Sequence, residues 1–313
     1  MLFEKIGKET WLDLMKTEQI NLLYAQSTFH ERITNAYHSS CSYFAVTDKS
    51  GIVLALPILH RSKDASFLTH FFYQYIFINE QLSERKRIEA LNLLVESLLK
   101  LFDKIDFKFD TNFNDIRAFT WNGFQNSTYY TYIIQLTEQL NYSDNINRQL
   151  KKYKSDYYVD VVEDIKDVQH YIQVQIDDMI KNGMSTKERK SIERWLMESI
   201  KSKQADLFQL KNNENTSIGS AIYLKDDSKA YLIATMSKDA SQVLLYDYVF
   251  NYYKSQGLQS IDLLGGNIPN IAIYKSQFDA QLKSYIIVSY RKNKLWEQIK
   301  STLKLKIKSM LNK

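Results

Sequence analysis

A pair of adjacent glycines places the strongest constraint on the fold of this chain. The run Ile261–Pro269 reads Ile-Asp-Leu-Leu-Gly-Gly-Asn-Ile-Pro. Its apolar start predicts a short buried strand over 258–264, which Gly265 and Gly266 end at once. Pro269 suits the first position of a following helix, where its missing N–H is not needed. A strand, a tight bend and a short helix are therefore expected in direct succession.

The segments on either side extend this pattern. Ser241 or Asp239 can cap a helix that ends near Gln256, before Gly257. The apolar positions that we expect on its buried face are Leu244, Leu245, Tyr248, Val249, Tyr252 and Tyr253. Residues 281–290 are rich in Tyr, Ile and Val and predict a closing strand.

This order of elements resembles the C-terminal half of a GNAT (N-acetyltransferase-like) domain. It is more closely similar to the FemAB-like family, whose members carry two GNAT-type domains and attach amino acids to peptidoglycan precursors. The family signature runs aromatic-Lys-x-Gly-Phe-Gly, and residues 274–279 here read Tyr-Lys-Ser-Gln-Phe-Asp. The aromatic residue, the lysine and the phenylalanine match, whereas Gln277 and Asp279 replace both glycines.

The first half of the chain carries further points of resemblance. Leu56-Pro57-Ile58 fits the family's Ile/Leu-Pro-Leu strand, residues 71–75 resemble an aromatic Phe-Thr-Gln-Tyr segment beside the cleft, and residues 121–124 fit Trp-x-Gly-Phe. The patterns predict helices over 9–16 and 83–102 and strands over 42–47, 51–59, 104–109 and 129–136.

The second half repeats the same order. Residues 145–152 resemble the Asn-x-Arg-Arg-x-Ile-Arg-Lys helix that opens the second domain of the family. Helices are predicted over 168–181 and 186–203, and antiparallel strands over 205–210, 216–224 and 229–236. We therefore predict an α/β protein with mixed (α+β) sheets. Two tandem GNAT-like domains, 1–140 and 141–290, would pack around a central cleft.

The composition narrows the function classes. A chain of 313 residues with 44% hydrophobic content can fill two cores. Its single cysteine, Cys41, excludes an internal disulfide framework, and its five histidines show no metal-ligand spacing and no catalytic triad, so we assign no metal. No signal peptide, membrane span or DNA-binding pattern is evident, and we expect a cytoplasmic protein.

The net charge of +5 is concentrated at the C-terminal end. Residues 291–313 hold eight Lys and Arg against Glu297 alone, so the remainder of the chain is near −2. Apolar residues recur there at helical spacing, which predicts a basic amphipathic helix. Such a helix either lies peripherally on anionic lipid at the inner membrane face or packs on the body of the protein.

The loop before the 241–256 helix distinguishes between two donors. In acetyl-CoA users of the GNAT class this loop has the form Arg/Gln-x-x-Gly-x-Gly/Ala, since glycine lets backbone N–H groups approach the pyrophosphate. Residues 237–242 contain no glycine, and Asp239 adds a negative charge. The resemblance to FemAB-like proteins implies an aminoacyl-tRNA donor and no bound cofactor, and acyl-CoA is the alternative donor.

The resemblance also directs the choice of site residues. Lys275 is the first candidate for stabilising an oxyanion or holding an acceptor phosphate, although a solvated lysine is the alternative. Asp262 can accept a proton or cap the turn that follows it. The candidates for substrate binding are Tyr231, Asn267, Tyr274, Gln74, Tyr75, Arg148, Lys151 and Lys152. Strand packing, or a solvated helix face for the three cations, would explain most of them equally well.

These observations predict a FemAB-like transferase that moves an aminoacyl or acyl group onto an amine of a cell-envelope (peptidoglycan-type) precursor. Its partners would be aminoacyl-tRNA and a lipid-linked or nucleotide-linked precursor. One alternative is a GNAT N-acyltransferase that uses acyl-CoA on a sugar or polysaccharide intermediate. Another is a catalytically silent double-GNAT protein that binds such molecules.

Overall fold

The computed structural model describes residues 1–65, 73–239 and 241–292. The first half contains β1 (Leu2–Ile6), α1 (Lys8–Thr17), η1 (Leu23–Ala25), α2 (Ser27–Tyr37), β2 (Ser40–Asp48), β3 (Gly51–His60), β4 (Asp64–Ala65), β5 (Phe77–Ile78), α3 (Glu84–Leu101), β6 (Lys104–Lys108), α4 (Arg117–Trp121) and β7 (Gln125–Gln135). The second contains α5 (Asp144–Tyr153), β8 (Tyr157–Val161), α6 (Ile165–Lys181), η2 (Thr186–Glu188), α7 (Arg189–Lys201), β9 (Ala205–Asn212), β10 (Ser217–Lys225), β11 (Lys229–Ser237), α8 (Gln242–Ser255), β12 (Ser260–Asp262), α9 (Pro269–Ser276) and β13 (Gln281–Arg291).

The two halves repeat one order of elements. Setting aside β4 and the short 3₁₀ turns, the series β1-α1-α2-β2-β3-β5-α3-β6-α4-β7 corresponds to β8-α6-α7-β9-β10-β11-α8-β12-α9-β13. In each half a long helix follows one strand and precedes the next along the chain: α3 lies between β5 and β6, and α8 lies between β11 and β12. These are the strands that separate from each other in a GNAT sheet. The predicted fold class, mixed α/β with two tandem GNAT-like units, is confirmed.

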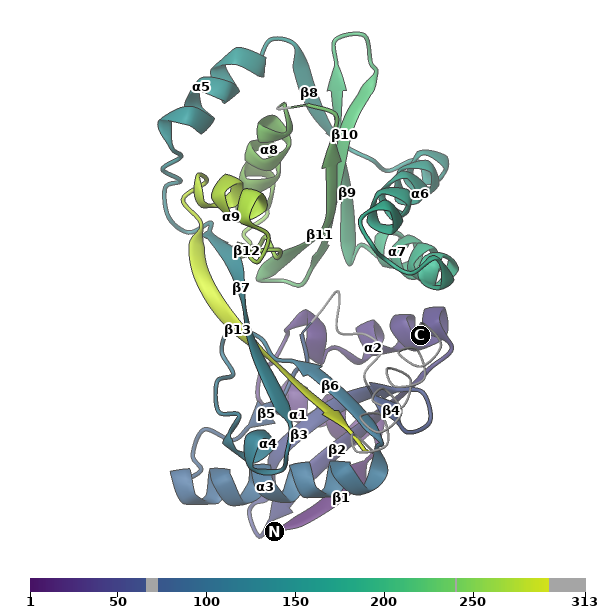
Figure 1. Cartoon of the computed structure of the whole chain (residues 1–313), viewed down its shortest axis with the longest axis vertical. Coiled ribbons are helices and arrows are strands. Elements are labelled where there is room, and N and C mark those ends of the chain that lie inside the picture. Colours follow the sequence, from purple (N-terminus) through teal and green to yellow (C-terminus); the bar gives the residue numbers. More distant parts are fainter. Residues whose placement is uncertain (66–72, 240, 293–313) are drawn as a thin grey trace, which may run out of the picture.

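Two long strands connect the halves (Figure 1). One described sheet has the order β1-β2-β3-β5, and the other runs β4-β6-β13-β7-β12-β11-β10-β9-β8. Thus β7, from the first half, pairs with β12 of the second, while β13 returns to pair with β6 of the first. Each half therefore completes its sheet with the last strand of the other. The predicted division at residue 140 is not tested by this geometry and stays a prediction.

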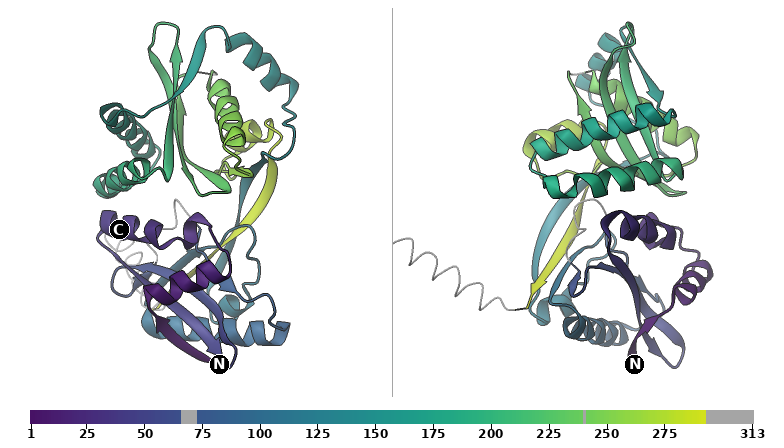
Figure 2. Two further views of the ribbon diagram at one scale, coloured as in Figure 1. Left: turned by 180° about the vertical axis from the view of Figure 1, so that it is seen from behind. Right: turned by 90° about the vertical axis from the view of Figure 1, so that its right-hand side faces the viewer.

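Helices cover the sheet of the second half on both faces, α6 and α7 on one side and α8 and α9 on the other (Figure 2). One apolar core extends across both halves, since α7 packs on α2 and the ring of Trp195 lies 6.4 Å from that of Phe29. The two halves share buried aromatic side chains, so the junction between them is a packed interface.

Several predicted details were wrong or incomplete. Helix α8 buries Val243, Tyr246 and Phe250 and exposes Tyr248, because this helix is apolar on nearly every side and its neighbours decide which face is buried. Strand β12 is shorter than predicted, and the predicted 186–203 helix begins as the separate 3₁₀ turn η2. The elements β1, α2, α4 and β8 were not predicted. Beyond Lys292, the predicted C-terminal helix lies outside the described residues.

Candidate functional site

The carboxylate of Asp262 is the centre of a buried polar cluster. Asp262 ends β12 and lies opposite Tyr231 of the parallel strand β11, where the two strands separate. Its side chain is 0% exposed and accepts hydrogen bonds from the Tyr73 hydroxyl at 3.0 Å, the Leu264 N–H at 3.0 Å and the Thr131 hydroxyl. The bond from Leu264 is the turn cap that the sequence allowed. The other two bonds tie β12 to β7 and to the first half of the chain.

Three lysines surround this carboxylate. The ammonium of Lys229 lies 3.5 Å from Asp262 Oδ2, and that of Lys275 donates to the carbonyl oxygens of Leu263 at 2.6 Å and Leu264 at 2.9 Å. The Lys108 ammonium lies over aromatic rings, 4.6 Å from the centre of Tyr73. A lysine has three N–H donors, so its two contacts within the described part of the chain leave Lys275 one donor for a ligand.

Burial changes the acid–base properties of two of these lysines. Both Lys108 and Lys275 are 5% exposed. Desolvation lowers the pKa of each to about 8, and the charge of Asp262 opposes part of that shift. Amines with such a pKa exchange protons near neutral pH, which an ordinary surface lysine does not.

Aromatic side chains close the cluster. Tyr231 is buried, and its ring centre lies 4.8 Å from that of Tyr24. Burial raises the pKa of Tyr231 and of Tyr73, and nearby carboxylates raise both further. These hydroxyls therefore stay protonated and act as hydrogen-bond donors at neutral pH.

Of the predicted site residues, the structure brings Lys275, Asp262 and Tyr231 together. Asn267 lies in the turn before α9 and binds the backbone of Tyr130, accepting from its N–H at 3.0 Å and donating to its C=O at 3.2 Å. Tyr274 packs its ring 5.1 Å from that of Phe278, and its buried hydroxyl has no hydrogen-bond partner among the described residues.

The other predicted residues lie in two separate places. Gln74 and Tyr75 line a pocket in the first half, where Gln74 donates to the Pro57 carbonyl at 2.6 Å. The cations Arg148, Lys151 and Lys152 are exposed on α5. Among the described residues, no recorded contact joins these three cations to the Asp262 cluster.

Four residues of the cluster were not predicted from the sequence: Lys108, Lys229, Tyr73 and Thr131. Lys108 ends β6 and lies between two buried phenylalanines, Phe107 and Phe109. Because side chains alternate along a strand, a lysine at this position is expected to point towards solvent, and the sequence gives no sign that it is buried. Tyr73 directly precedes the Gln74-Tyr75 pair, and this proximity was the one available indication. Thr131 and Lys229 reach Asp262 only because β7 and β11 flank β12.

The positions where the family signature has glycine serve a structural purpose here. Asp279 has a φ of 62°, a left-handed conformation that glycine adopts freely and aspartate tolerates. Its carboxylate accepts from the Asn141 N–H at 3.1 Å, and the side chain of Gln277 accepts from Asn145 Nδ2 at 2.7 Å. Both substitutions thus anchor the segment that leads into α5, while the backbone geometry at position 279 remains the one that favours glycine.

In the loop before α8, a carboxylate of the protein itself binds the backbone N–H of Ser241. Asp239 accepts from the N–H of Ser241 at 2.8 Å and also from the Ser241 hydroxyl. Partial burial raises the pKa of Asp239, but its bonds with Ser241 outweigh this effect and lower the pKa overall. A stable negative charge therefore lies where a GNAT protein would receive a pyrophosphate.

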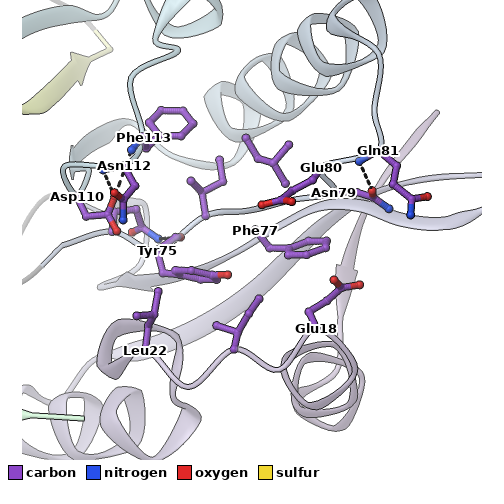
Figure 3. A pocket seen from close by; sticks show the side chains of 14 residues that line it. Glu18, Leu22, Tyr75, Phe77, Asn79, Glu80, Gln81, Asp110, Asn112 and Phe113 are labelled. Atoms are coloured by element: carbon purple, nitrogen blue, oxygen red, sulfur yellow. Dashed lines mark hydrogen bonds between the residues drawn. The ribbon is translucent and has the colours of Figure 1, made fainter. Parts of the chain in front are cut away.

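The pocket of the first half has a cavity volume of about 820 Å³ (Figure 3). It opens where β5 separates from the end of β6, beyond the parallel bridge between Gln74 and Phe109. The acidic residues in its wall are Glu18, Glu80 and Asp110, and no Lys, Arg or His is found among the described residues that line it. This pocket and the Asp262 cluster thus occupy corresponding places in the two repeats.

Within the described residues, no group of His, Cys, Asp and Glu is arranged to hold a metal ion. No helix in the same part of the chain has the length and apolar character needed to cross a membrane.

The order of elements is repeated, and each repeat has an opening, by which we mean the place where two neighbouring strands separate. The Asp262 cluster lies at the one between β11 and β12, and the pocket lies at the one between β5 and β6. These features define a mixed α/β protein built from two GNAT-type units. No family model and no curated protein matches the chain. Solved structures do: FemX, at 11% identity and a TM-score of 0.63, covers 96% of this chain and 99% of its own. A tandem GNAT protein from the clavulanic acid biosynthesis pathway, solved without AcCoA, is 11% identical with a TM-score of 0.56, covering 93% and 98%.

A third similar structure is L-PGS from Bacillus licheniformis, at 12% identity and a TM-score of 0.54, covering 93% of this chain and 94% of that protein. At such low identity these similarities establish the fold alone. The chain has the FemAB-like double-GNAT fold that its signature residues predicted.

Proposed function

We propose that this protein is a FemAB-like transferase that moves an aminoacyl or acyl group onto an amine of a cell-envelope precursor. The acceptor amine attacks the ester carbonyl of the donor, so that an amide bond forms and the ester C–O bond breaks. The freed hydroxyl of the donor leaves with the proton that the amine gives up. The ester needs stabilisation of the developing oxyanion, and the acceptor needs to lose its proton.

The Asp262 cluster supports these roles. Lys275 offers its remaining N–H to the oxyanion or to an acceptor phosphate, at a site where burial makes such a bond strong. Asp262 positions the cluster through Lys229 and Tyr73. Lys108, whose pKa is lowered to about 8 by burial, is a candidate to receive the proton of the amine and to pass it to the leaving hydroxyl.

The donor that we propose is an aminoacyl-tRNA, and the observation that carries this choice is the Asp239 carboxylate on the Ser241 N–H. That N–H is not free for a pyrophosphate, and the negative charge would repel one. The remaining predicted residues then have assigned roles: Tyr231, Asn267, Tyr274, Gln74 and Tyr75 contact substrates. The exposed cations Arg148, Lys151 and Lys152 hold phosphates of the tRNA.

Direct binding tests this proposal. The full chain is titrated with CoA, acetyl-CoA and a mixed aminoacyl-tRNA pool at moderate salt, with uncharged tRNA as the control for charge attraction. We expect a preference for charged over uncharged tRNA that Lys275→Met weakens. The matched control is Lys283→Met, because Lys283 is an exposed lysine of β13. Binding of CoA alone would contradict the proposed donor and favour an acyl-CoA enzyme acting on a sugar or polysaccharide intermediate.

One observation favours a second candidate, a catalytically silent binding protein. The Asp262 carboxylate is fully buried, and its contacts are made by groups of the protein itself. A Lys275→Ala strain indistinguishable from wild type in cell-envelope composition would support that candidate. Loss of an envelope modification in the same strain, with the protein still folded, would exclude it.

The membrane contact proposed for residues 291–313 has its own test. Deletion of 291–313 is expected to abolish sedimentation with anionic liposomes, whereas unchanged sedimentation would contradict the contact. The same deletion removes Arg291, which pairs with Asp106, so truncation after Lys292 is the better version of this experiment.

A further inference from the structure

The pocket of the first half is built from parts with different chemistry. Its volume of about 820 Å³ lies within the range of pockets that enclose small ligands, roughly 300–1,000 Å³. Aromatic side chains, Tyr75, Phe77 and Phe113, line it together with the aliphatic Leu22 (Figure 3). The cavity therefore has the apolar and aromatic walls that hold the carbon chain of a ligand.

The charged side chains that line the same pocket, within the described part of the chain, all have one sign. Glu18 follows α1, Glu80 lies before α3, and Asp110 follows β6, so the three carboxylates come from separate segments around the cavity. Since the described residues of the lining include no Lys, Arg or His, a phosphate or carboxylate ligand would be repelled by these three carboxylates. The pocket selects for positive charge carried at several points.

Tyr75 lies between two of these carboxylates. Burial raises the pKa of its hydroxyl, and the charges of Asp110 and Glu18 raise it further. Its ring projects into the cavity in Figure 3. An aromatic face with flanking carboxylates attracts an ammonium group both through the ring and through the charges.

The strand edge adds a backbone acceptor. Strand β5 lies at the edge of its sheet, and the Asn79 N–H bonds to the Val53 carbonyl at 2.9 Å. In an antiparallel pair the residue between two bonded positions turns its N–H and C=O away from the partner strand. Ile78 is that residue, so its carbonyl points away from β3, on the side where the pocket lies.

We propose that this pocket binds a linear aliphatic polyamine, with ammonium groups at the carboxylates and the methylene chain along the aromatic wall. This inference goes beyond the proposed function, because a polyamine is a different molecule from the cell-envelope precursor that supplies the acceptor amine there. Several separated carboxylates favour a ligand with several ammonium groups over one with a single amine.

Calorimetric titration of the full chain tests the proposal with spermidine, putrescine and butylamine as probes. We expect affinity to rise with the number of amines, from butylamine to spermidine. A double variant, Glu18→Gln with Asp110→Asn, is expected to bind spermidine about tenfold more weakly, at about threefold for each carboxylate. Asn at position 110 can still accept the N–H bonds that Asp110 now accepts from Asn112 and Phe113, so the loop keeps its shape.

The matched control separates a binding site from general charge attraction. Asp13→Asn with Glu96→Gln changes the net charge equally at exposed positions outside the pocket, and it should leave spermidine affinity unchanged. Equal weakening by both double variants, or displacement of spermidine by magnesium chloride at matched ionic strength, would overturn the proposal.

Two further probes identify the ligand class. A blocked lysine dipeptide that binds more tightly than spermidine would replace the polyamine with a peptide amine, and binding of uridine diphosphate in this pocket would contradict the argument from charge. The Lys275→Met variant should bind spermidine normally. Loss of spermidine binding with retained discrimination of charged tRNA would therefore reject this inference alone and leave the proposed transferase in place.

Discussion

The two corresponding openings of the repeat differ in the charge that their walls provide. The opening in the second half gathers Lys108, Lys229 and Lys275 around the buried carboxylate of Asp262. The opening in the first half is a pocket of about 820 Å³, and the charged residues among its described lining are carboxylates. One architecture thus supports a buried, mostly cationic cluster and an open anionic pocket.

This difference indicates that the two repeats of one fold can provide opposite electrostatic environments for two different chemical tasks. A cationic, desolvated cluster stabilises negative charge that develops on a carbonyl, whereas an anionic pocket attracts amines. The exchange of β7 and β13 links the two sites, since Thr131 of β7 binds Asp262, and Tyr73 binds it from the first half. Removing a charge should therefore have different consequences in the two openings.

The largest effect should follow from Asp262→Asn. This change removes the negative charge from a site with three lysines, and uncompensated buried charge costs about 3–5 kcal/mol of unfolding free energy. Urea denaturation of wild type and Asp262→Asn at pH 7 measures this loss of unfolding free energy. The counterpart in the other opening, Asp110→Asn, should cost less than about 1 kcal/mol, because Asp110 is only partly buried. Similar costs at both positions would remove the contrast between the openings.

A steric change should have the next largest effect. A Cβ added at Gly266 would lie 2.6 Å from the backbone oxygen of Tyr130, so Gly266→Ala has to push β7 away from the turn. We expect a loss of about 1–3 kcal/mol in unfolding free energy. Gly123→Ala is a useful contrast, since its Cβ would meet no atom within 4 Å and only its φ of 82° is unfavourable. If Gly266→Ala lost less unfolding free energy than Gly123→Ala, β7 would be shown to move away from the turn at little energetic cost.

The pH dependence of stability is a further point of contrast. The two lysines with a pKa of about 8 are deprotonated in the folded protein above that pH, while in the unfolded chain they hold protons up to their ordinary pKa of 10.5. The unfolded state thus binds more protons in this window, so unfolding free energy should rise from pH 8 towards pH 10, by about 1–3 kcal/mol. Above pH 10 the buried tyrosines reverse the trend, because Tyr24, Tyr73 and Tyr231 keep their protons only when folded.

Urea denaturation of wild type and Lys275→Met between pH 7.5 and 10 measures this slope. The variant should be less dependent on pH, because it lacks one of the two titrating groups. Glu18→Gln, in the other opening, should keep the wild-type slope. A slope that does not change in Lys275→Met would assign the pH dependence to other groups.

The sequence was sufficient for the repeated architecture because local signals mark most of the elements, with β1, α2, α4 and β8 among the exceptions. Gly265, Gly266 and Pro269 fixed the turn that places Lys275 beside Asp262, and the aromatic-Lys-x-x-Phe signature singled out the lysine. Periodicity located α1, α3, α6 and β13 to within a few residues. These features depend on neighbours in sequence, which is why a single chain reveals them.

The rest of the site depends on contacts between distant segments. Thr131 reaches Asp262 only because β7 pairs with β12 of the second half. The residue pattern of 125–135 does not indicate whether this strand joins the sheet of the second half or stays within the first. Lys108 reads as an ordinary strand lysine until Tyr73 and Tyr285 enclose it. The acidic pocket joins residues from three loops, so no local spacing could have predicted it.

The smallest expected effect sharpens the contrast in donor recognition. Asp239→Ala removes the carboxylate that accepts the Ser241 N–H and should cost about 0.5–1 kcal/mol of unfolding free energy, as the loss of a helix cap does. The same change frees that N–H and removes a negative charge, so weak binding of CoA should increase by about threefold. Strong CoA binding is not expected, because the loop still lacks the glycines that allow close approach to a pyrophosphate. If Asp239→Ala bound CoA as tightly as aminoacyl-tRNA, one side chain would be all that separates this opening from an acyl-CoA site.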